Sequence, residues 1–298
     1  MAFRRLTEKQ KHILGISGLC ILTLLGIGLM VYPWLSSAYM NQVRSKIQTE
    51  YQAQISASNQ EQLDEIREAA MTYNGQLARG EMSLLEPEEN GYYEQLIVPN
   101  TSNVMAYIHI PTIHVDLPIY HGVGTDSLNA GCGHMPQSSL PIGGESTHSV
   151  LSAHTGMANS AMFSDLPLLA PGDIFQIEVL GETLTYEIQS SEDIQTVLPV
   201  EVQAVQIKNG QDLCTLVTCI PFGINSHRLL VTGHRIPTPE VIQEKLEDLP
   251  LKEEKSDSVW LSEYKSALLI GTIIIFCMAL GAAGTVYYIS RKQGKFTK

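Results

Sequence analysis

The chain has 298 residues and a net charge of −12, with 31 acidic and 19 basic residues. A nucleic-acid-binding protein needs clustered lysines and arginines to neutralise phosphates, so this acidic balance argues against such a function. Two clusters of basic residues lie near the ends of the chain, at positions 4–11 and 291–298. Each cluster flanks a long apolar segment, which points to a membrane.

The apolar segments span residues 13–35 and 267–289, and neither contains Asp, Glu, Lys or Arg. Each has about the roughly 20 apolar residues that a helix needs to cross a bilayer, so we expect two transmembrane helices. The alternative for the first is a cleaved signal peptide, although its apolar run is long and no small-x-small site follows it. Basic tails at 1–12 and 290–298 place both termini in the cytoplasm. The acidic middle of this two-pass protein would face outward.

Residues 36–80 are polar and contain no proline. Apolar residues recur in this segment at spacings of three, four or eight, which predicts a helical stalk or a helix lying against the domain. These residues are Ile47, Tyr51, Ile55, Leu63, Ile66 and Ala70. The following segment, 81–103, is acidic and contains Pro, Asn and Gly, so it is predicted to be a loop.

Residues 104–237 contain short apolar runs separated by Pro, Gly and Asp. This spacing predicts seven or eight strands in an all-β sandwich or barrel, with a short helix near 162–169. The expected strands are 104–110, 115–120, 149–154, 174–179, 183–189, 214–219 and 227–232. Residues 238–266 are acidic again and are expected to link the domain to the second span.

A thiol and a guanidinium meet at one predicted hairpin. Cys219 ends a strand, Pro221 and Gly223 open a loop, and Arg228 begins the next strand. A cysteine nucleophile needs a histidine for proton transfer and donors for an oxyanion, and Arg228 lies close enough to be such a donor. Arg235 would lie roughly 23 Å further along and on the other strand face.

Other interpretations of the cysteines and histidines remain open at this point. Cys219 could be a buried core cysteine. A zinc site would draw on Cys132 and His134 with His121, His148 or His154, but the chain has no Cys-x-x-Cys pair and we expect no metal. A papain-like protease would need its His and Asn well after the cysteine, where the only histidines lie within fifteen residues.

Residues 215–219 read Thr-Leu-Val-Thr-Cys, which resembles the Thr-Leu-x-Thr-Cys signature of sortases. The continuation through residue 235, the blocks at 107–111 and 117–122, and the block at 140–154 are similar to the pilin-polymerising class C branch. The resemblance covers residues 104–237 in collinear order. A membrane helix at each end is typical of that class.

The resemblance implies an eight-stranded sortase β-barrel and three catalytic residues. Cys219 would be the nucleophile, His154 the proton-transferring histidine, and Arg228 the stabiliser of substrate and oxyanion. The implied reaction cleaves a Leu-Pro-x-Thr-Gly-like sorting signal between Thr and Gly and passes the acyl group to a pilin lysine, without a cofactor. Thr218 and Thr155 are candidate substrate contacts, and Thr155 stands where many relatives have Arg.

Class C relatives usually carry a lid with an Asp-Pro-aromatic motif that plugs the active site. The nearest candidate here is Glu86-Pro87-Glu88, and Tyr92 or Tyr93 could supply the aromatic ring, so the lid is expected within 81–103. Two alternative functions stay open. One is a sortase that anchors surface proteins to cell-wall peptide, and the other is a catalytically silent membrane scaffold.

Overall fold

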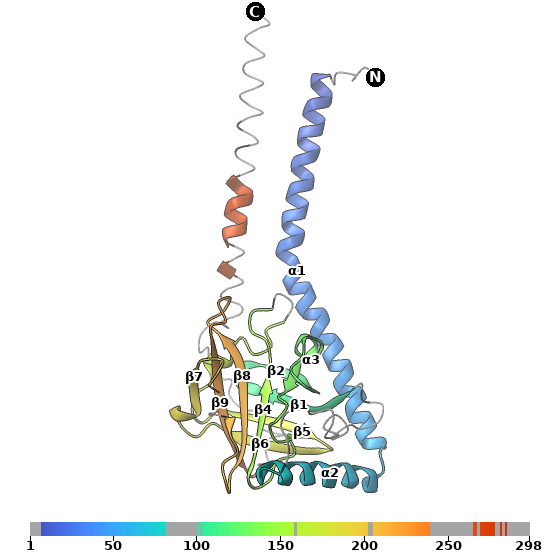
Figure 1. The fold of residues 1–298 in the computed structure, drawn as a ribbon. Coiled ribbons are helices and arrows are strands. Elements are labelled where there is room, and N and C mark those ends of the chain that lie inside the picture. Colours follow the sequence, from blue (N-terminus) through green and yellow to red (C-terminus); the bar gives the residue numbers. More distant parts are fainter. Residues whose placement is uncertain are drawn as a thin grey trace, which may run out of the picture. The chain divides into compact units, whose positions relative to one another are not determined.

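The computed structural model divides the chain into two compact units, Ala38–Trp260 and Met1–Ser37 with Leu261–Lys298 (Figure 1). The residues that the structure describes are 7–81, 101, 103–157, 160–201, 205–238, 265–266, 269–277, 281 and 284. The candidate lid residues Glu86, Pro87, Tyr92 and Tyr93 and most of the acidic linker lie outside them. Those expectations therefore stay predictions.

Helix α1 (Glu8–Ala57) contains the whole first apolar segment and continues well beyond it. Within the described residues it is the one helix long and apolar enough to cross a membrane, and its most apolar 18-residue stretch has a mean hydropathy of 2.3. Large apolar side chains on it are exposed, as a lipid-facing helix requires. Of the second predicted span, only 269–277 and single residues beyond it are described, and they are helical. That span remains a prediction.

The predicted stalk is two helices rather than one. Helix α1 ends at Ala57, and α2 (Gln60–Ala78) begins after Asn59, whose side chain accepts a hydrogen bond from the Glu61 amide as an N-cap. Tyr51, Leu63 and Ala70 are at most 5% exposed. The helical spacing of apolar residues in this segment therefore reflects packing against the domain, as predicted.

Eight strands close into a mixed β-barrel, which confirms the predicted fold. The sheet order is β6-β5-β1-β2-β3-β4-β8-β9, and the barrel closes where β6 pairs with residues 234–236 of β9. Strand β7 pairs with residues 228–231 of β9. The strands are β1 (Val104–Ile110), β2 (Val115–His121), β3 (Cys132–His134), β4 (Thr147–Ser152), β5 (Ile174–Val179), β6 (Glu182–Glu187), β7 (Ile194–Val197), β8 (Asp212–Ile220) and β9 (His227–Ile236). Strands β3 and β7 were not expected from the sequence.

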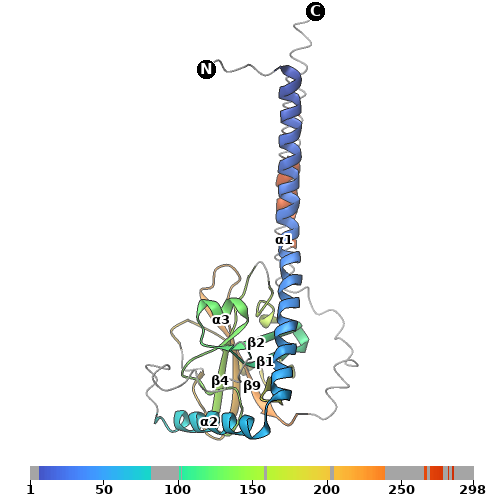
Figure 2. The same ribbon diagram turned by 90° about the vertical axis from the view of Figure 1, so that its right-hand side faces the viewer.

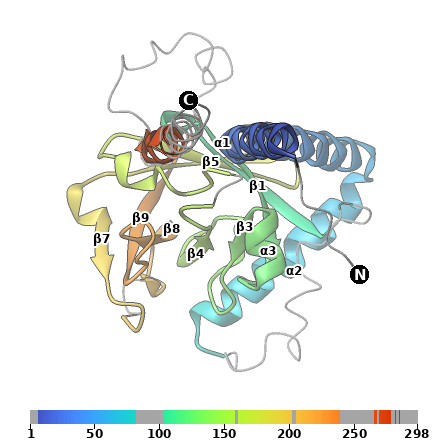
Figure 3. The ribbon, with the colours of Figure 1, turned by 90° about the horizontal axis from the view of Figure 1, so that it is seen from above.

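The barrel interior is filled by one apolar cluster that includes Ile108, Phe175 and Leu216, each fully buried. Short helix α3 (Thr125–Ala130) lies between β2 and β3. In place of the helix expected at 162–169, one 3₁₀ turn spans Leu166–Leu168. Figure 3 shows β7, β9, β8, β4 and β3 side by side on one wall of the barrel.

Helix α2 crosses one end of the barrel (Figure 2). Its buried Asn74 donates to the carbonyl of Leu140 at 3.1 Å and accepts from the amide of Leu140 at 2.7 Å. Arg67 of the same helix pairs with Glu182 on β6. Tyr51 of α1 donates its hydroxyl to the carbonyl of Met105, and burial raises the pKa of this phenol. Polar anchors thus hold both helices on the domain.

The Asn74→Ala variant is expected to lose about 3 kcal/mol of unfolding free energy, because two buried backbone groups of Leu140 lose their partner. Denaturant unfolding of the detergent-solubilised protein measures this loss. The matched control is Gln60→Ala, which removes an exposed contact to Asp64 on the same helix. An Asn74→Ala variant as stable as this control would contradict the prediction.

Candidate active site

The ends of β4, β8 and β9 bring three predicted site residues into one row. Cys219 and Arg228 are direct partners in the antiparallel β8–β9 ladder. In the parallel β4–β8 ladder, Ser152 pairs with Val217, and the Ala153 amide continues the ladder by bonding the Val217 carbonyl at 3.2 Å. Continued by one more residue, this register would place His154 beside Cys219. Neighbouring strands lie about 4.8 Å apart, so Cys219 on β8 would then have His154 on one side and Arg228 on the other.

The row lies on the outer face of the barrel wall. Val217 and Leu230 belong to a small apolar cluster outside the main core, whereas Leu216 and Leu229 belong to the core. Side chains alternate along a strand, so Cys219, two residues after Val217, points to the outer face. The side chains of Cys219, His154 and Arg228 are all partly exposed. None of the three is sealed in the barrel core.

Cys219 differs from the two other cysteines of the barrel. Cys132 and Cys214 are fully buried, and burial raises the pKa of both thiols. Cys219 alone among these three is partly exposed. Because the thiolate is the attacking species, a buried thiol with a raised pKa is a poor nucleophile. The interpretation as a buried core cysteine thus applies to Cys132 and Cys214 and not to Cys219.

The backbone around His154 is held by the end of β8. The Thr218 hydroxyl donates to the Ala153 carbonyl at 2.9 Å, and the Phe163 amide donates to the His154 carbonyl at 3.1 Å. Thr218 was expected to contact substrate, but its side chain is 1% exposed and engaged in this bond. It therefore holds the histidine segment in place. Thr155 is partly exposed beside His154 and stays a candidate substrate contact.

The loop between β8 and β9 orients the arginine. Arg228 donates through Nη1 to the carbonyls of Asn225 at 3.2 Å and His227 at 3.1 Å. Asn225 has a left-handed backbone with φ 58°. The Phe222 ring of the β8–β9 loop packs so close to Gly156, in the loop after His154, that a Cβ at Gly156 would lie only 3.2 Å from the ring. The two loops are therefore in contact.

Comparison with known proteins gives the chain a family. The family model described as the sortase domain matches residues 108–236. The crystal structure of sortase C1 from Streptococcus agalactiae is 41% identical in sequence, with 64% of this chain and 97% of that chain covered and a TM-score of 0.59. The chain belongs to the sortase family.

Further relatives support the sortase assignment and its class. The X-ray structure of Clostridium perfringens sortase C with the C-terminal cell wall sorting motif is 37% identical, covering 65% of this chain and 99% of that one at a TM-score of 0.55. Sortase A of Streptococcus agalactiae serotype III (strain NEM316) is 30% identical over 119 residues, which are 39% of this chain and 47% of that protein. The structural relatives of this sortase are of class C.

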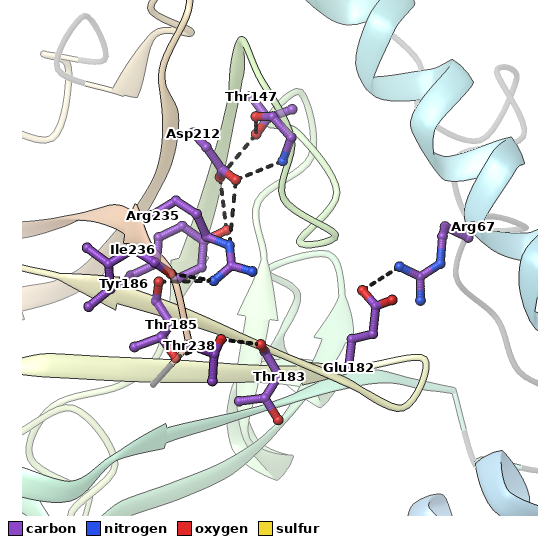
Figure 4. Close-up of polar contacts among 11 residues, drawn as sticks. Arg67, Thr147, Glu182, Thr183, Thr185, Tyr186, Asp212, Arg235, Ile236 and Thr238 are labelled. Atoms are coloured by element: carbon purple, nitrogen blue, oxygen red, sulfur yellow. Dashed lines mark hydrogen bonds and ion pairs between the residues drawn. The ribbon is translucent and has the colours of Figure 1, made fainter. Parts of the chain in front are cut away.

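Arg235, the rival arginine, is a structural residue of this sortase. It lies opposite Tyr186 in the β6–β9 ladder, with its guanidinium 5.8 Å from the centre of that ring. Its Nη1 donates to the carbonyls of Thr185 and Ile236, and its Nε lies 3.8 Å from Asp212 (Figure 4). Asp212 is seven residues before Cys219, or roughly 23 Å at strand rise. The geometry therefore favours Arg228 for catalysis.

Asp212 is the centre of the polar network in Figure 4. It accepts hydrogen bonds from the Gly144 amide at 2.8 Å, the Tyr186 hydroxyl at 3.1 Å and the Thr147 hydroxyl at 3.4 Å. Burial raises the pKa of this carboxyl, although the donors oppose it. Gly143 and Gly144 both have positive φ. The glycine pair of the 140–154 block thus fixes the start of β4 against the start of β8.

Two histidines of the rival zinc interpretation, His134 and His148, have other partners. His134 bonds the Ser139 carbonyl at 2.8 Å, and burial lowers the pKa of its imidazole to about 3. His148 bonds the Thr215 hydroxyl at 2.6 Å and the Gln206 carbonyl at 2.8 Å. Across the described ranges, no group of three or more His, Cys, Asp and Glu side chains has the arrangement of a metal site.

His134 is expected to make the stability of the domain depend on pH. Its pKa is lower in the folded state than the unfolded value near 6.5, so the neutral imidazole stabilises the fold above pH 6.5. That contribution is lost as the pH falls toward 3, at about 1.4 kcal/mol per unit. Unfolding free energies of wild type and His134→Gln between pH 8 and pH 4.5 measure the effect.

The His134→Gln variant should show a shallower loss of stability below pH 6.5 than the wild type. His114→Gln is the matched control, since that histidine lies in a surface turn and its substitution should leave the slope unchanged. Equal slopes for wild type and His134→Gln would refute the assignment of this acid sensitivity to His134.

Proposed function

We propose that the protein is a membrane-anchored cysteine transpeptidase that polymerises pilins by a sortase mechanism. The observation that carries the proposal is the row formed by His154, Cys219 and Arg228 on the outer barrel face. A nucleophile, a proton-transferring group and a fixed cation on adjacent strands are what acyl transfer from an amide requires. A catalytically silent scaffold has no use for this row.

In the first half-reaction, the Cys219 thiolate attacks the threonine carbonyl carbon of a Leu-Pro-x-Thr-Gly-like signal. The oxyanion that forms accepts hydrogen bonds from the Arg228 guanidinium, which stays cationic at any working pH. His154 as imidazolium gives its proton to the glycine nitrogen while the C–N bond breaks. A thioester on Cys219 and a free glycine amine are the products.

In the second half-reaction, the unprotonated amine of a pilin lysine attacks the thioester carbon. His154, now neutral, takes the proton that the amine loses, and the C–S bond breaks to release the Cys219 thiolate. An isopeptide bond joins the two pilin subunits, and the site returns to its starting charge state. Arg228 stabilises the second oxyanion as it does the first.

A buried apolar cluster lies beside the row. Its Val217 and Leu230, two residues along the strands from Cys219 and Arg228, are each 5% exposed, and Val197 of β7 packs against them. Val197 also pairs with Arg228 in the β7–β9 ladder. A Leu-Pro-x-Thr-Gly-like signal is the substrate that we propose for this row. The C. perfringens relative, whose structure includes the sorting motif, supports this class of substrate.

The same proposal includes membrane topology and a lid. The apolar segment of α1 supports anchoring, and the second predicted span at 267–289 would make the protein two-pass, with the barrel outside and both termini in the cytoplasm. The segment 81–103, with Glu86, Pro87, Tyr92 and Tyr93, would cover the site as a lid. Pilins and the bilayer are the proposed partners.

Anchoring of surface proteins to cell-wall peptide is the second candidate function. Sequence relatives of this chain include a sortase A, so membership of the family alone does not decide between the two functions, whereas the structural relatives named above are class C. Mass spectrometry of the cellular product separates the two candidates. A pilin lysine in isopeptide linkage supports polymerisation, and a wall-peptide amine supports anchoring.

The Cys219→Ala variant is expected to abolish high-molecular-weight pilin ladders and leave pilin monomers, because the other two cysteines of the barrel are buried and cannot replace the nucleophile. Immunoblotting of a strain that lacks other sortases measures the ladders. Cys214→Ala, a buried change on the same strand, is the matched control and should retain them. Ladders that persist with Cys219→Ala would refute the proposed function.

Replacement of Arg228 by Lys should lower kcat/KM by about 100-fold, since one ammonium replaces the fixed fork of donors at the oxyanion. A fluorogenic sorting-signal peptide with a lysine-mimicking amine measures the rate. Arg235→Lys is the control and should reduce stability while leaving kcat/KM within about threefold, because Arg235 bonds the structural network. Similar losses in both variants would argue against the assignment of Arg228.

A further inference from the structure

Arg44 is a buried cation on the part of α1 that packs on the barrel. Its side chain is 5% exposed, with Nη1 donating to the Ser160 hydroxyl at 2.7 Å and Nε to the Ala130 carbonyl at 3.3 Å. Burial lowers its pKa, and within the described part of the chain Nη2 has no partner and no carboxylate pairs with it. Burying an unpaired charge is unfavourable, so α1 docking alone does not explain an arginine here.

One acceptor of Arg44 lies just before β3, at the end of the β3–β4 ladder that is nearest to His154. Gly133 pairs with Ser152 in this antiparallel ladder. Continued by two residues, the register would place Gly131 opposite His154. Ala130, whose carbonyl accepts from Arg44, is the residue before Gly131. The guanidinium therefore reaches the same edge of the barrel as the catalytic row.

Ser160 lies in the loop that follows His154. The Phe163 amide bonds the His154 carbonyl, and the Gly156 amide bonds the Ser164 hydroxyl at 3.0 Å, so the loop returns to its starting point. Ser160 is 2% exposed and forms an isolated bridge with Met157. Arg44 thus holds the middle of a loop whose first residues include His154 and Thr155.

The other contacts of α1 lie elsewhere on the barrel. Tyr51 bonds the Met105 carbonyl on β1, Gln48 bonds His109 on β1, and Gln52 donates to Glu178 on β5. These contacts attach the helix to the β1–β5 wall. Among the described contacts of α1, the hydrogen bond from Arg44 is the one that reaches the loop after His154.

We propose that Arg44 is a positioning residue for the transpeptidase reaction, acting through Ser160 on the loop that carries His154. The expected change in kcat rests on the proposed function. In this proposal, helix α1 both anchors the protein and helps to hold His154 in the position that it needs for proton transfer. Loss of Arg44 would then lower turnover without weakening the binding of the sorting signal, because Arg44 is buried and would not contact that peptide.

The kinetic test uses the full-length protein in detergent micelles with a sorting-signal peptide and an amine acceptor. Arg44→Met is expected to lower kcat about tenfold and leave KM within twofold. Ser160→Ala, which deletes the acceptor and is the smaller change, should lower kcat in the same direction. The double variant should be no slower than Arg44→Met alone, because the two residues act through one bond. Gln52→Ala on the same helix is the control and should keep wild-type kcat.

Hydrogen exchange separates failure of this inference from failure of the proposed function. Exchange in residues 153–165 needs no turnover, and it should become faster in Arg44→Met and Ser160→Ala but not in Gln52→Ala. Unchanged exchange in Arg44→Met and Ser160→Ala would overturn the inference. Additive kcat losses in the double variant, or a rise in KM, would also overturn it. The two variants could exchange faster while the wild-type protein shows no turnover that depends on Cys219. That result would support the contact between Arg44 and the loop and would reject the transpeptidase function.

Discussion

The register of β8 between β4 and β9 is the constraint on which the site depends. Strand side chains alternate, so a slip of one residue would turn Cys219 toward the core and Thr218 toward solvent. The observed register does the opposite, with Thr218 buried and bonded to Ala153 while Cys219 is partly exposed. Because β4 runs parallel and β9 antiparallel to β8, one register aligns the end of β4 with the β8–β9 hairpin, which is more than sixty residues later in the chain.

That register is secured far from the row, at the other end of β8. Asp212 binds the Gly144 amide at the start of β4, while Tyr186 and Arg235 approach it from β6 and β9. On the outer face, Thr215 bonds both His148 of β4 and Thr232 of β9. Polar bonds of this kind, of which the one between His148 and Thr215 is buried, penalise a shifted register, since a slip would leave several groups unpaired. Contacts at the Asp212 end of β8 thus help to fix the alignment at the Cys219 end, where we propose catalysis.

The sequence predicts the hairpin part of the site from local spacing alone. A strand that ends at Cys219, a loop with turn residues and a strand that begins at Arg228 leave little freedom in how the two residues pair. His154 is different, because its distance from Cys219 along the chain is spanned by several strands. Only the family resemblance pointed to it, and the β4–β8 register then accounts for its position.

Other features were hidden from the sequence for identifiable reasons. Strand β3 (Cys132–His134) is too short for an alternating pattern to show, and β7 has no buried residue. Thr218 belongs to the recognised motif, but sequence spacing does not say whether a hydroxyl faces substrate or a carbonyl. The packed face of the helix was predicted from the spacing of apolar residues alone. Arg44 is charged, so the pattern gave no sign that it is buried in the folded structure.

For the proposed role of Arg228 at the oxyanion, the way in which its loop holds the guanidinium would matter as much as its charge. Nη1 is directed by the carbonyls of Asn225 and His227, and the left-handed backbone at Asn225 helps to turn the loop back toward the arginine. A guanidinium fixed in this way keeps its remaining N–H groups in a constant plane. Donors already in place need no reorganisation when negative charge develops on the substrate oxygen. A flexible ammonium at the same position would carry the charge without that plane.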